Sequence, residues 1–303
     1  LRHTGYGGKI TLISKEDKAP YNRPLLSKAF LAGSMSEDKL LLGGKDWASN
    51  NNIDLRLNQT VSDVLPDECT IVIKNEKGES AQQSADFLVI ATGAEPKVPP
   101  FKGADLDGVY TLRSMDDAKA IKTATDNKKV VIVGTGFIGM EAAAALAQAG
   151  ETTSITIVGR SARVMSNIVS ETVSNALIKL HEQKGIKFAF GANVDQINGD
   201  SKVTGVTLSD GSTLDADVII LGTGVVPRTE LLNDVNDPDG VQVDDHLQLR
   251  DGVYALGDIA RATNQMGRMR IEHWRVALQH GIVTAAAILG ENDVNSLEER
   301  IPF

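Results

Sequence analysis

Cysteine is nearly absent from this sequence of 303 residues, which contains one, Cys69. A single cysteine excludes an internal disulfide framework, a Cys-x-x-Cys pair and a thiolate metal site. Histidine is scarce as well. The five histidines are scattered, and His273 and His280 are more typical of one helix face than of a metal site. The sequence therefore predicts neither a disulfide-stabilised protein nor a metalloprotein.

Two further features are missing, a basic stripe and a long apolar run. The formal net charge is −9 and no basic stripe is visible, so nucleic acid is not expected as the main partner. No apolar run approaches the roughly 18 residues of a membrane-spanning helix, so no membrane span is predicted. With 42% hydrophobic and 23% charged residues, the composition is that of a globular protein long enough for two domains.

The most informative segment, residues 129–160, follows the order strand, glycine turn, helix, strand. A β-branched run at 130–133 precedes the turn, an Ala-rich helix is expected to end at Gly150, and a second β-branched run occupies 155–158. Three glycines form a G-x-G-x-x-G motif in the turn: Gly134, Gly136 and Gly139. In this context the motif predicts a nucleotide site, because a tight turn, a close pyrophosphate and close helix–strand packing all require glycine.

The chain contains an internal repeat. KITLISK at 9–15 matches SITIVGR at 154–160, and SADFLVIATGA at 84–94 matches DADVIILGTGV at 215–225, in the same order. Each member of the second pair follows a hairpin-like stretch with glycine in its turn. Two copies of one nucleotide-binding architecture are therefore predicted. The same offset places the counterpart of Gly134 upstream of residue 1, so we expect the chain to begin inside a βαβ unit.

The two copies differ in the segment after their matching strand. The first carries APYNRPLLSKAFLAG at 19–33, where two prolines predict an extended loop ahead of a helix that begins at Ser27. The second carries a predicted helix at 170–184 instead. A further helix is expected at 272–289.

Taken together, these segments resemble the FAD-dependent pyridine nucleotide-disulfide oxidoreductase family, and within it the ferredoxin-reductase and apoptosis-inducing-factor-like branch. The segments that carry the resemblance are PYNRPLLSKAFL, the ATG of Ala91 to Gly93, LRSMDDA, GTGFIGME, YALGDIA and IEHWRVALQHG. The resemblance implies an α/β fold with two Rossmann-like, three-layer domains. The FAD-binding domain would comprise 1–113 and 241–303, with an NAD(P)-binding domain at 114–240 inserted in it. Family members also have an N-terminal FAD glycine motif, and a third domain that would begin near Pro302.

The resemblance also implies an enzyme that passes hydride from NADH or NADPH to FAD. In the family, disulfide reductases relay electrons through a cysteine pair, and peroxidase-like members use a single cysteine at the position matched here by Lys28. Because Cys69 lies in a different stretch, neither route applies. The remaining family route is one-electron transfer to an iron–sulfur protein of the ferredoxin, rubredoxin or Rieske type.

The resemblance assigns the catalytic contact to Lys28 and Glu141, which would pair at the mouth of the nicotinamide site. The alternative for Glu141 is a charge that complements the helix N-terminus. Beside Lys28, the residues that resemble FAD contacts are Glu16, Arg23, Val61, Ala91, Thr92, Gly93, Arg113, Gly257, Asp258 and Trp274. Glu16 would bind the adenosine ribose, with Asp17 as the alternative. Asp258 would bind the ribityl hydroxyls, although a helix N-cap is also open.

The expected NAD(P) contacts are Gly134, Gly136, Phe137, Ile138, Gly139, Glu141, Arg160, Arg163, Gly222, Thr223 and Gly224. An acid about 20 residues into the βαβ unit would bind the 2′-hydroxyl of NAD. Gly159 occupies that position, with Arg160 and Arg163 after it, so NADPH and NADH are both expected.

Two other functions stay open at this stage. One is a redox-sensing flavoprotein in the manner of apoptosis-inducing factor, and the other is the electron-input part of a nitrite-reductase-type enzyme. A homodimer is among the assemblies that remain open. The single cysteine fits a reducing compartment, and does not distinguish the cytosol from the mitochondrial matrix.

Overall fold

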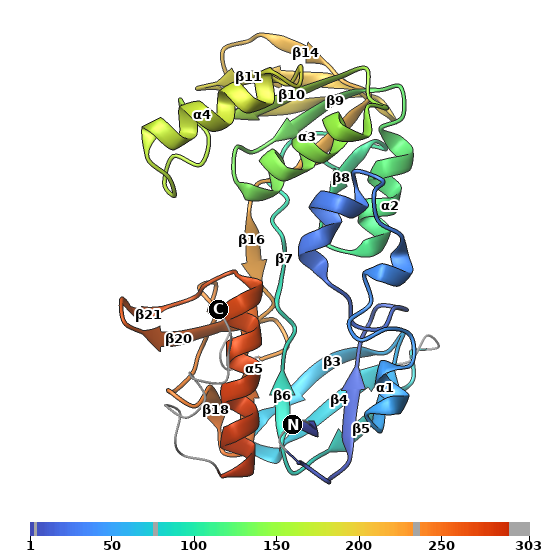
Figure 1. Ribbon diagram of the computed structural model, residues 1–303, viewed down its shortest axis with the longest axis vertical. Coiled ribbons are helices and arrows are strands. Elements are labelled where there is room, and N and C mark those ends of the chain that lie inside the picture. The colour runs from blue at the N-terminus through green and yellow to red at the C-terminus, as the bar shows by residue number, and fades with distance from the viewer. Residues whose placement is uncertain (3–4, 75–77, 233–236, 291–303) are drawn as a thin grey trace. The chain divides into compact units, whose positions relative to one another are not determined.

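The computed structural model describes residues 1–2, 5–74, 78–232 and 237–290 (Figure 1). The expected start of another domain near Pro302 lies outside these residues. The chain divides into two compact units. Unit 1 comprises residues 1–20, 42–95 and those from 226 onward, and unit 2 comprises 21–41 and 96–225. Within the described residues, no helix is long and apolar enough to cross a bilayer.

Unit 2 is built on a five-stranded parallel sheet in the order β11-β10-β9-β15-β8. The strands are β8 (Val109–Thr111), β9 (Lys129–Val133), β10 (Ser154–Gly159), β11 (Lys187–Phe190) and β15 (Val218–Leu221). The β-branched central strands β9, apart from Lys129, and β15 are buried on both faces, as expected of a parallel sheet with covered faces.

Different structures cover the two faces of this sheet (Figure 1). Alternate residues of β9 point to opposite faces: Val130 and Ile132 pack with the helices, while Val131 and Val133 pack with a three-stranded antiparallel sheet. The helices are α2 (Met115–Ala124), α3 (Phe137–Ala149) and α4 (Glu171–Glu182), and the antiparallel strands are β12 (Val194–Gly199), β13 (Val203–Leu208) and β14 (Thr213–Asp215). Unit 2 therefore has three layers.

Two helices of unit 2 lie where the sequence predicts them: α3 ends at Gly150, and α4 falls within the predicted 170–184, whereas α2 was not predicted. Ser170 is the N-cap of α4, and its hydroxyl accepts from the N–H of Val173. Gly150 ends α3 in the left-handed conformation, with φ 73°. Ser114 and Asp117 form a capping box at the start of α2.

The 21–41 segment, which precedes the second copy by more than 50 residues, packs into the core of unit 2. Leu26, Leu31 and Leu40 are buried there with Met115 and Met140. The segment contains short helical turns at Arg23–Leu25, Leu26–Phe30 and Glu37–Lys39. The prediction of a helix beginning at Ser27 is wrong, because the helical turns already start at Arg23, where Pro24 is tolerated in the first turn. Ser27 is instead buried.

Unit 1 repeats much of the architecture of unit 2. Its β1 pairs in parallel with β2, as β10 pairs with β11, and its antiparallel sheet β3-β4-β5 corresponds to β12-β13-β14. The bounds are β1 (Ile10–Ile13), β2 (Ile53–Arg56), β3 (Thr60–Leu65), β4 (Thr70–Lys74) and β5 (Ser80–Ser84). The predicted duplication is thus present. Among the described residues, β1 pairs on one edge only, whereas β10 lies between β11 and β9.

The rest of unit 1 includes β6 (Leu88–Ile90), which pairs in parallel with β19 (Val253–Ala255). Further elements are α1 (Trp47–Asn50), β17 (Val241–Gln242), β18 (Gln248–Arg250), β20 (Ala260–Asn264), β21 (Gly267–Met269) and α5 (Trp274–Leu289). The last helix starts two residues later than predicted, because the His273 ring caps it by accepting from the N–H of Arg275.

The chain passes between the units in β7 (Ala94–Pro96) and β16 (Val225–Pro227), which pair with each other. The compact units differ from the predicted domains 1–113 with 241–303 and 114–240, above all because the 21–41 segment belongs to unit 2. Which nucleotide each domain binds stays a prediction.

Candidate nucleotide-binding site

The glycine turn after β9 is a tight junction of backbone. Gly134 has φ +122°, and a Cβ there would lie 2.2 Å from the carbonyl oxygen of Gly222. A Cβ at Gly139 would lie 2.1 Å from the carbonyl oxygen of Gly134, so α3 could not pack this close to the turn with any other residue. Two of the three predicted glycine roles, the turn and the packing, are therefore met by the geometry.

Gly136, the N-cap of α3, differs from the other two glycines of the motif, Gly134 and Gly139. A Cβ built there would meet no atom within 4 Å, and its φ of −82° is accessible to any residue. The backbone is thus open on this side. Because the first N–H groups of a helix have no partner inside the helix, the start of α3 offers donors to an anion. These features fit the pyrophosphate of a dinucleotide.

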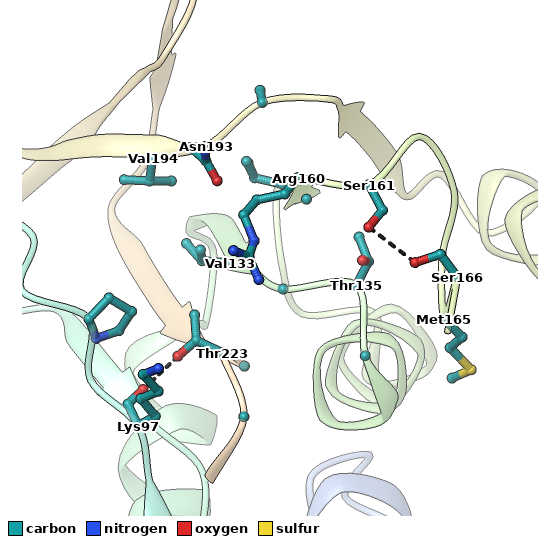
Figure 2. A pocket seen from close by; sticks show the side chains of 18 of the residues that line it. Lys97, Val133, Thr135, Arg160, Ser161, Met165, Ser166, Asn193, Val194 and Thr223 are labelled. Carbon is teal, nitrogen blue, oxygen red and sulfur yellow. Dashed lines mark hydrogen bonds between the residues drawn. The ribbon is translucent and has the colours of Figure 1, made fainter. Parts of the chain in front are cut away.

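A cavity of about 520 Å³ lies beside the turn (Figure 2). Its volume is within the range of cofactor sites. Its walls come from residues 133–136, 158–161, 165–168, 192–194, 222–224 and the 97–101 stretch. The Thr223 hydroxyl donates to the carbonyl oxygen of Lys97, which fixes two of these walls to each other.

The predicted NAD(P) residues divide into two groups with respect to this cavity. Those that line it are Gly134, Gly136, Arg160, Gly222, Thr223 and Gly224. Those that are not among its lining residues are Phe137, Ile138, Gly139, Glu141 and Arg163. Among the latter, Phe137 and Ile138 are exposed in the first turn of α3.

All the charged side chains that line the cavity are positive. Lys97 and Arg160 are the charged residues among its described lining residues, and no Asp or Glu is among them. Figure 2 shows the Arg160 side chain extending into the cavity, toward Val133. Such a site favours an anionic ligand.

The two arginines after β10 have different surroundings. Arg163 donates from its Nη atoms to the carbonyl oxygens of Ser166 and Val169, both at 2.8 Å, and so holds the loop that it belongs to. Arg160 is exposed and, among the described residues, makes no hydrogen bond or ion pair. The sequence did not separate these two roles.

Lys28 and Glu141, which are 113 residues apart in the chain, meet within unit 2. Lys28 Nζ lies 2.7 Å from Glu141 Oε2 and also donates to the carbonyl oxygen of Pro24 at 3.0 Å. The sequence missed a third member: the buried Ser27 hydroxyl donates to the same Glu141 Oε2 at 2.5 Å. Its position before Lys28 was the available signal. Glu141 is therefore held by two donors on one oxygen.

The unit 1 residues that were predicted to contact FAD gather at the ends of two strands. Ala91, Thr92 and Gly93 follow β6, and Gly257 and Asp258 follow β19. Because these strands are parallel and in register, both turns lie at the same sheet edge, where α/β folds bind ligands. The turns are left-handed at both glycines, with φ 68° and 73°. This edge fits a nucleotide.

The other predicted FAD residues are more widely placed. Glu16 and Asp17 follow β1, Val61 lies in β3, and Trp274 is the exposed first residue of α5. In unit 2, Arg23 donates to the carbonyl oxygen of Arg113 and to the hydroxyl of Tyr21, each at 3.0 Å. Asp258 lies inside a short 3-10 turn, Gly257–Ile259, whose N-cap is Leu256, so the alternative role of Asp258 as a helix N-cap is wrong.

His280 on α5 supports the turn at Gly257 and was not predicted to do so. Its Nδ1 accepts from the N–H of Gly257 at 3.2 Å, and burial lowers the pKa of the imidazole below its ordinary value of 6.5. Protonation would remove this acceptor, so the neutral ring is the form that the fold requires.

We therefore expect the folded protein to lose stability as the pH falls below about 6.5. The unfolded chain then binds a proton at His280 that the folded chain excludes, and stability rises with pH where the unfolded state holds more protons. His280→Asn, which keeps an acceptor but does not titrate, should flatten this part of the profile. Thermal melts of both proteins between pH 5 and 8 measure the difference. Superimposable pH profiles would contradict the assignment.

Comparisons with known proteins agree with this geometry. The family described as pyridine nucleotide-disulphide oxidoreductase matches residues 1–281. Rubredoxin-NAD(+) reductase of Ectopseudomonas oleovorans is 34% identical over 96% of this chain and 76% of that protein. The ferredoxin–NAD(+) reductase component of the p-cumate 2,3-dioxygenase system of Pseudomonas putida is also 34% identical, over 96% of this chain and 71% of that protein.

A solved structure is also similar. The crystal structure of the covalent putidaredoxin reductase–putidaredoxin complex contains a chain that matches with a TM-score of 0.88 and 29% sequence identity. The match covers 96% of this chain and 71% of that one. It confirms the predicted α/β fold class.

Proposed function

Because the chain belongs to the pyridine nucleotide-disulphide oxidoreductase family, as its motifs predicted, we propose that it oxidises a reduced nicotinamide dinucleotide with FAD and passes single electrons to an iron–sulfur protein. The observation that carries the first half is the glycine turn that opens at Gly136 onto a positively lined cavity. The second half is supported by the relatives, whose names describe rubredoxin and ferredoxin reductases.

The residues of unit 2 would hold the dinucleotide along the cavity. The open backbone at Gly136 and the start of α3 would bind the pyrophosphate. Arg160 would contact the adenosine end, because it follows the strand β10 that neighbours the glycine turn. When bound, the nicotinamide and the flavin supply the hydride and electron chemistry, and the chain supplies binding, orientation and electrostatics.

Glu141 would orient the nicotinamide carboxamide. Both of its donors, Ser27 and Lys28, bind Oε2. Among the described residues, Oε1 makes no hydrogen bond, so this oxygen can accept from an amide N–H while Oε2 holds the side chain still. Lys28 would add a positive charge at the same place, where it stabilises negative charge that develops during transfer.

Cys69 offers no thiol relay. Its Sγ lies 3.7 Å from the carbonyl oxygen of Asp251, and burial, with the nearby carboxylates of Asp251 and Asp86, raises the pKa of the thiol. The thiol is therefore neutral at pH 7, and the thiolate is the reactive form. Electron exit through an iron–sulfur partner is consistent with this.

Anaerobic titration of the FAD-loaded protein with NADH and with NADPH tests the proposal. We expect at least one of them to bleach the flavin absorbance, and a [2Fe–2S] ferredoxin added afterwards to restore it as the ferredoxin is reduced. A flavin that neither nucleotide bleaches would overturn the oxidoreductase proposal. A flavin that is bleached but not reoxidised by ferredoxin, rubredoxin or a Rieske protein would overturn the choice of acceptor.

Replacing Cys69 by alanine is expected to leave turnover unchanged within about twofold, since the thiol takes no part in electron exit. Steady-state reduction of the ferredoxin at saturating nucleotide measures this. A loss of more than tenfold, with the flavin still bound, would show that the cysteine lies on the electron path.

A further inference from the structure

The end of β10 lacks the acid that would bind a ribose 2′-hydroxyl, and Thr135 packs tightly against that position. Gly159 is the last residue of the strand, and a Cβ there would lie 2.3 Å from Cγ2 of Thr135. An aspartate or glutamate at this position would require Thr135 to move. No other carboxylate is among the described lining residues of the cavity. The site therefore lacks the group that selects an unphosphorylated ribose.

The residue after Gly159 is Arg160, which carries a positive charge instead of a carboxylate. Arg160 extends its guanidinium into the cavity (Figure 2) and makes no hydrogen bond or ion pair among the described residues. Its five N–H donors are thus available, in a planar fork that matches phosphate geometry. Ser161 and Ser166 also line the cavity, with their hydroxyls 3.1 Å apart.

The loop that carries these hydroxyls is held without any ligand. Arg163 binds the carbonyl oxygens of Ser166 and Val169, the N–H of Met165 donates to the carbonyl oxygen of Thr135, and the buried Ser174 hydroxyl donates to that of Val164. None of these contacts involves Arg160, so a substitution there leaves the hydrogen bonds of the loop in place.

From these observations we infer that Arg160 binds a 2′-phosphate and that the chain prefers NADPH to NADH. This inference rests on the proposed function, because it concerns the same cavity. The relatives compared above carry NAD(+) in their names, so the preference would set this chain apart from them. A charge-assisted contact of this kind corresponds to a 10- to 100-fold difference in affinity, as an order of magnitude.

Adenosine nucleotides test the preference without any redox step. Isothermal titration of the purified chain should show 2′,5′-ADP binding at least tenfold more tightly than 5′-AMP. Arg160→Gln should reduce this ratio to about threefold or less, and Arg160→Lys should give an intermediate ratio because it keeps the charge but loses the planar fork. Added salt should weaken the 2′,5′-ADP complex more than the 5′-AMP complex.

A matched control is Lys187→Gln, which removes one positive charge from an exposed position of β11 outside the cavity. This variant should keep the wild-type ratio. Equal affinity of the wild-type chain for the two nucleotides would overturn the inference, and so would a ratio that Arg160→Gln leaves unchanged.

The anaerobic titration separates failure of this inference from failure of the proposed function. Flavin that NADH bleaches at lower concentration than NADPH would overturn the NADPH preference and leave the oxidoreductase in place. Flavin that neither nucleotide bleaches, in a chain that binds 2′,5′-ADP through Arg160, would overturn the redox function and keep the phosphate site.

Discussion

Replacing Lys28 by methionine is expected to slow reduction of the flavin by the nicotinamide about 100-fold, with little change in the stability of the fold. The rate falls because a preorganised charge at the transfer site is lost, and removal of such a group costs on the order of 10² to 10³ in rate. Stability changes little because Lys28 is about half exposed, and ion pairs of this kind contribute about 0–1 kcal/mol. Anaerobic stopped-flow absorbance measures the rate, and thermal melting measures the stability.

Unit 2 offers a close control for this variant. Lys119 and Glu37 form a second ion pair with the same N–O distance, 2.7 Å, and neither residue lines the cavity. Lys119→Met removes an equivalent contact and should leave the rate at its wild-type value. Equal rates for Lys28→Met and the wild-type protein would remove Lys28 from the transfer site, and equal losses in both variants would indicate a general effect of charge.

The glycine motif is expected to divide into a position that serves the fold and a position that serves the ligand. Gly139→Ala forces a methyl group against the carbonyl oxygen of Gly134, 2.1 Å away, where backbone on both sides cannot yield easily. Overpacking of this kind costs about 1–3 kcal/mol, which corresponds to a fall of roughly 5 °C in the melting temperature of unit 2. Circular dichroism melts measure it.

Gly136→Ala should weaken ligand binding and leave the stability of the fold nearly unchanged. Its methyl group meets no protein atom within 4 Å, so the melting temperature should change by less than about 2 °C. The methyl group instead occupies the face where the dinucleotide backbone would approach, and we expect affinity for NADPH to fall at least tenfold, about 1.4 kcal/mol. Titration calorimetry provides the affinity. If Gly136→Ala binds normally, the pyrophosphate does not lie over this turn.

Much of the fold could be predicted because its signals are local or repeated. The β-branched strands and the glycines of 129–160 lie together in the sequence, and the repeat predicts that β1 and β10 have equivalent partners. The contact between Lys28 and Glu141 is distant in sequence, and it was predicted through the resemblance to a known family. The structure contains this contact, and its catalytic role stays a prediction.

The parts that sequence reasoning missed depend on the direction of side chains and on long-range packing. Arg160 and Arg163 are three residues apart and look equivalent in the sequence, yet one faces the cavity and the other binds its own loop. The close approach of Thr135 to Gly159, which leaves no room for a Cβ, joins two different turns, so no local pattern reports it. The support of Gly257 by His280 likewise spans 23 residues and two elements.

The burial of the 21–41 segment has a practical consequence for anyone who wishes to isolate the dinucleotide-binding half. A contiguous fragment cut at 96–225 would discard Leu26, Leu31 and Leu40, and so strip the apolar cover from Met115 and Met140. Such a fragment would expose a hydrophobic surface to water and would tend to aggregate. An isolated fragment of unit 2 must therefore include residues 21–41, for example joined to residue 96 through a linker.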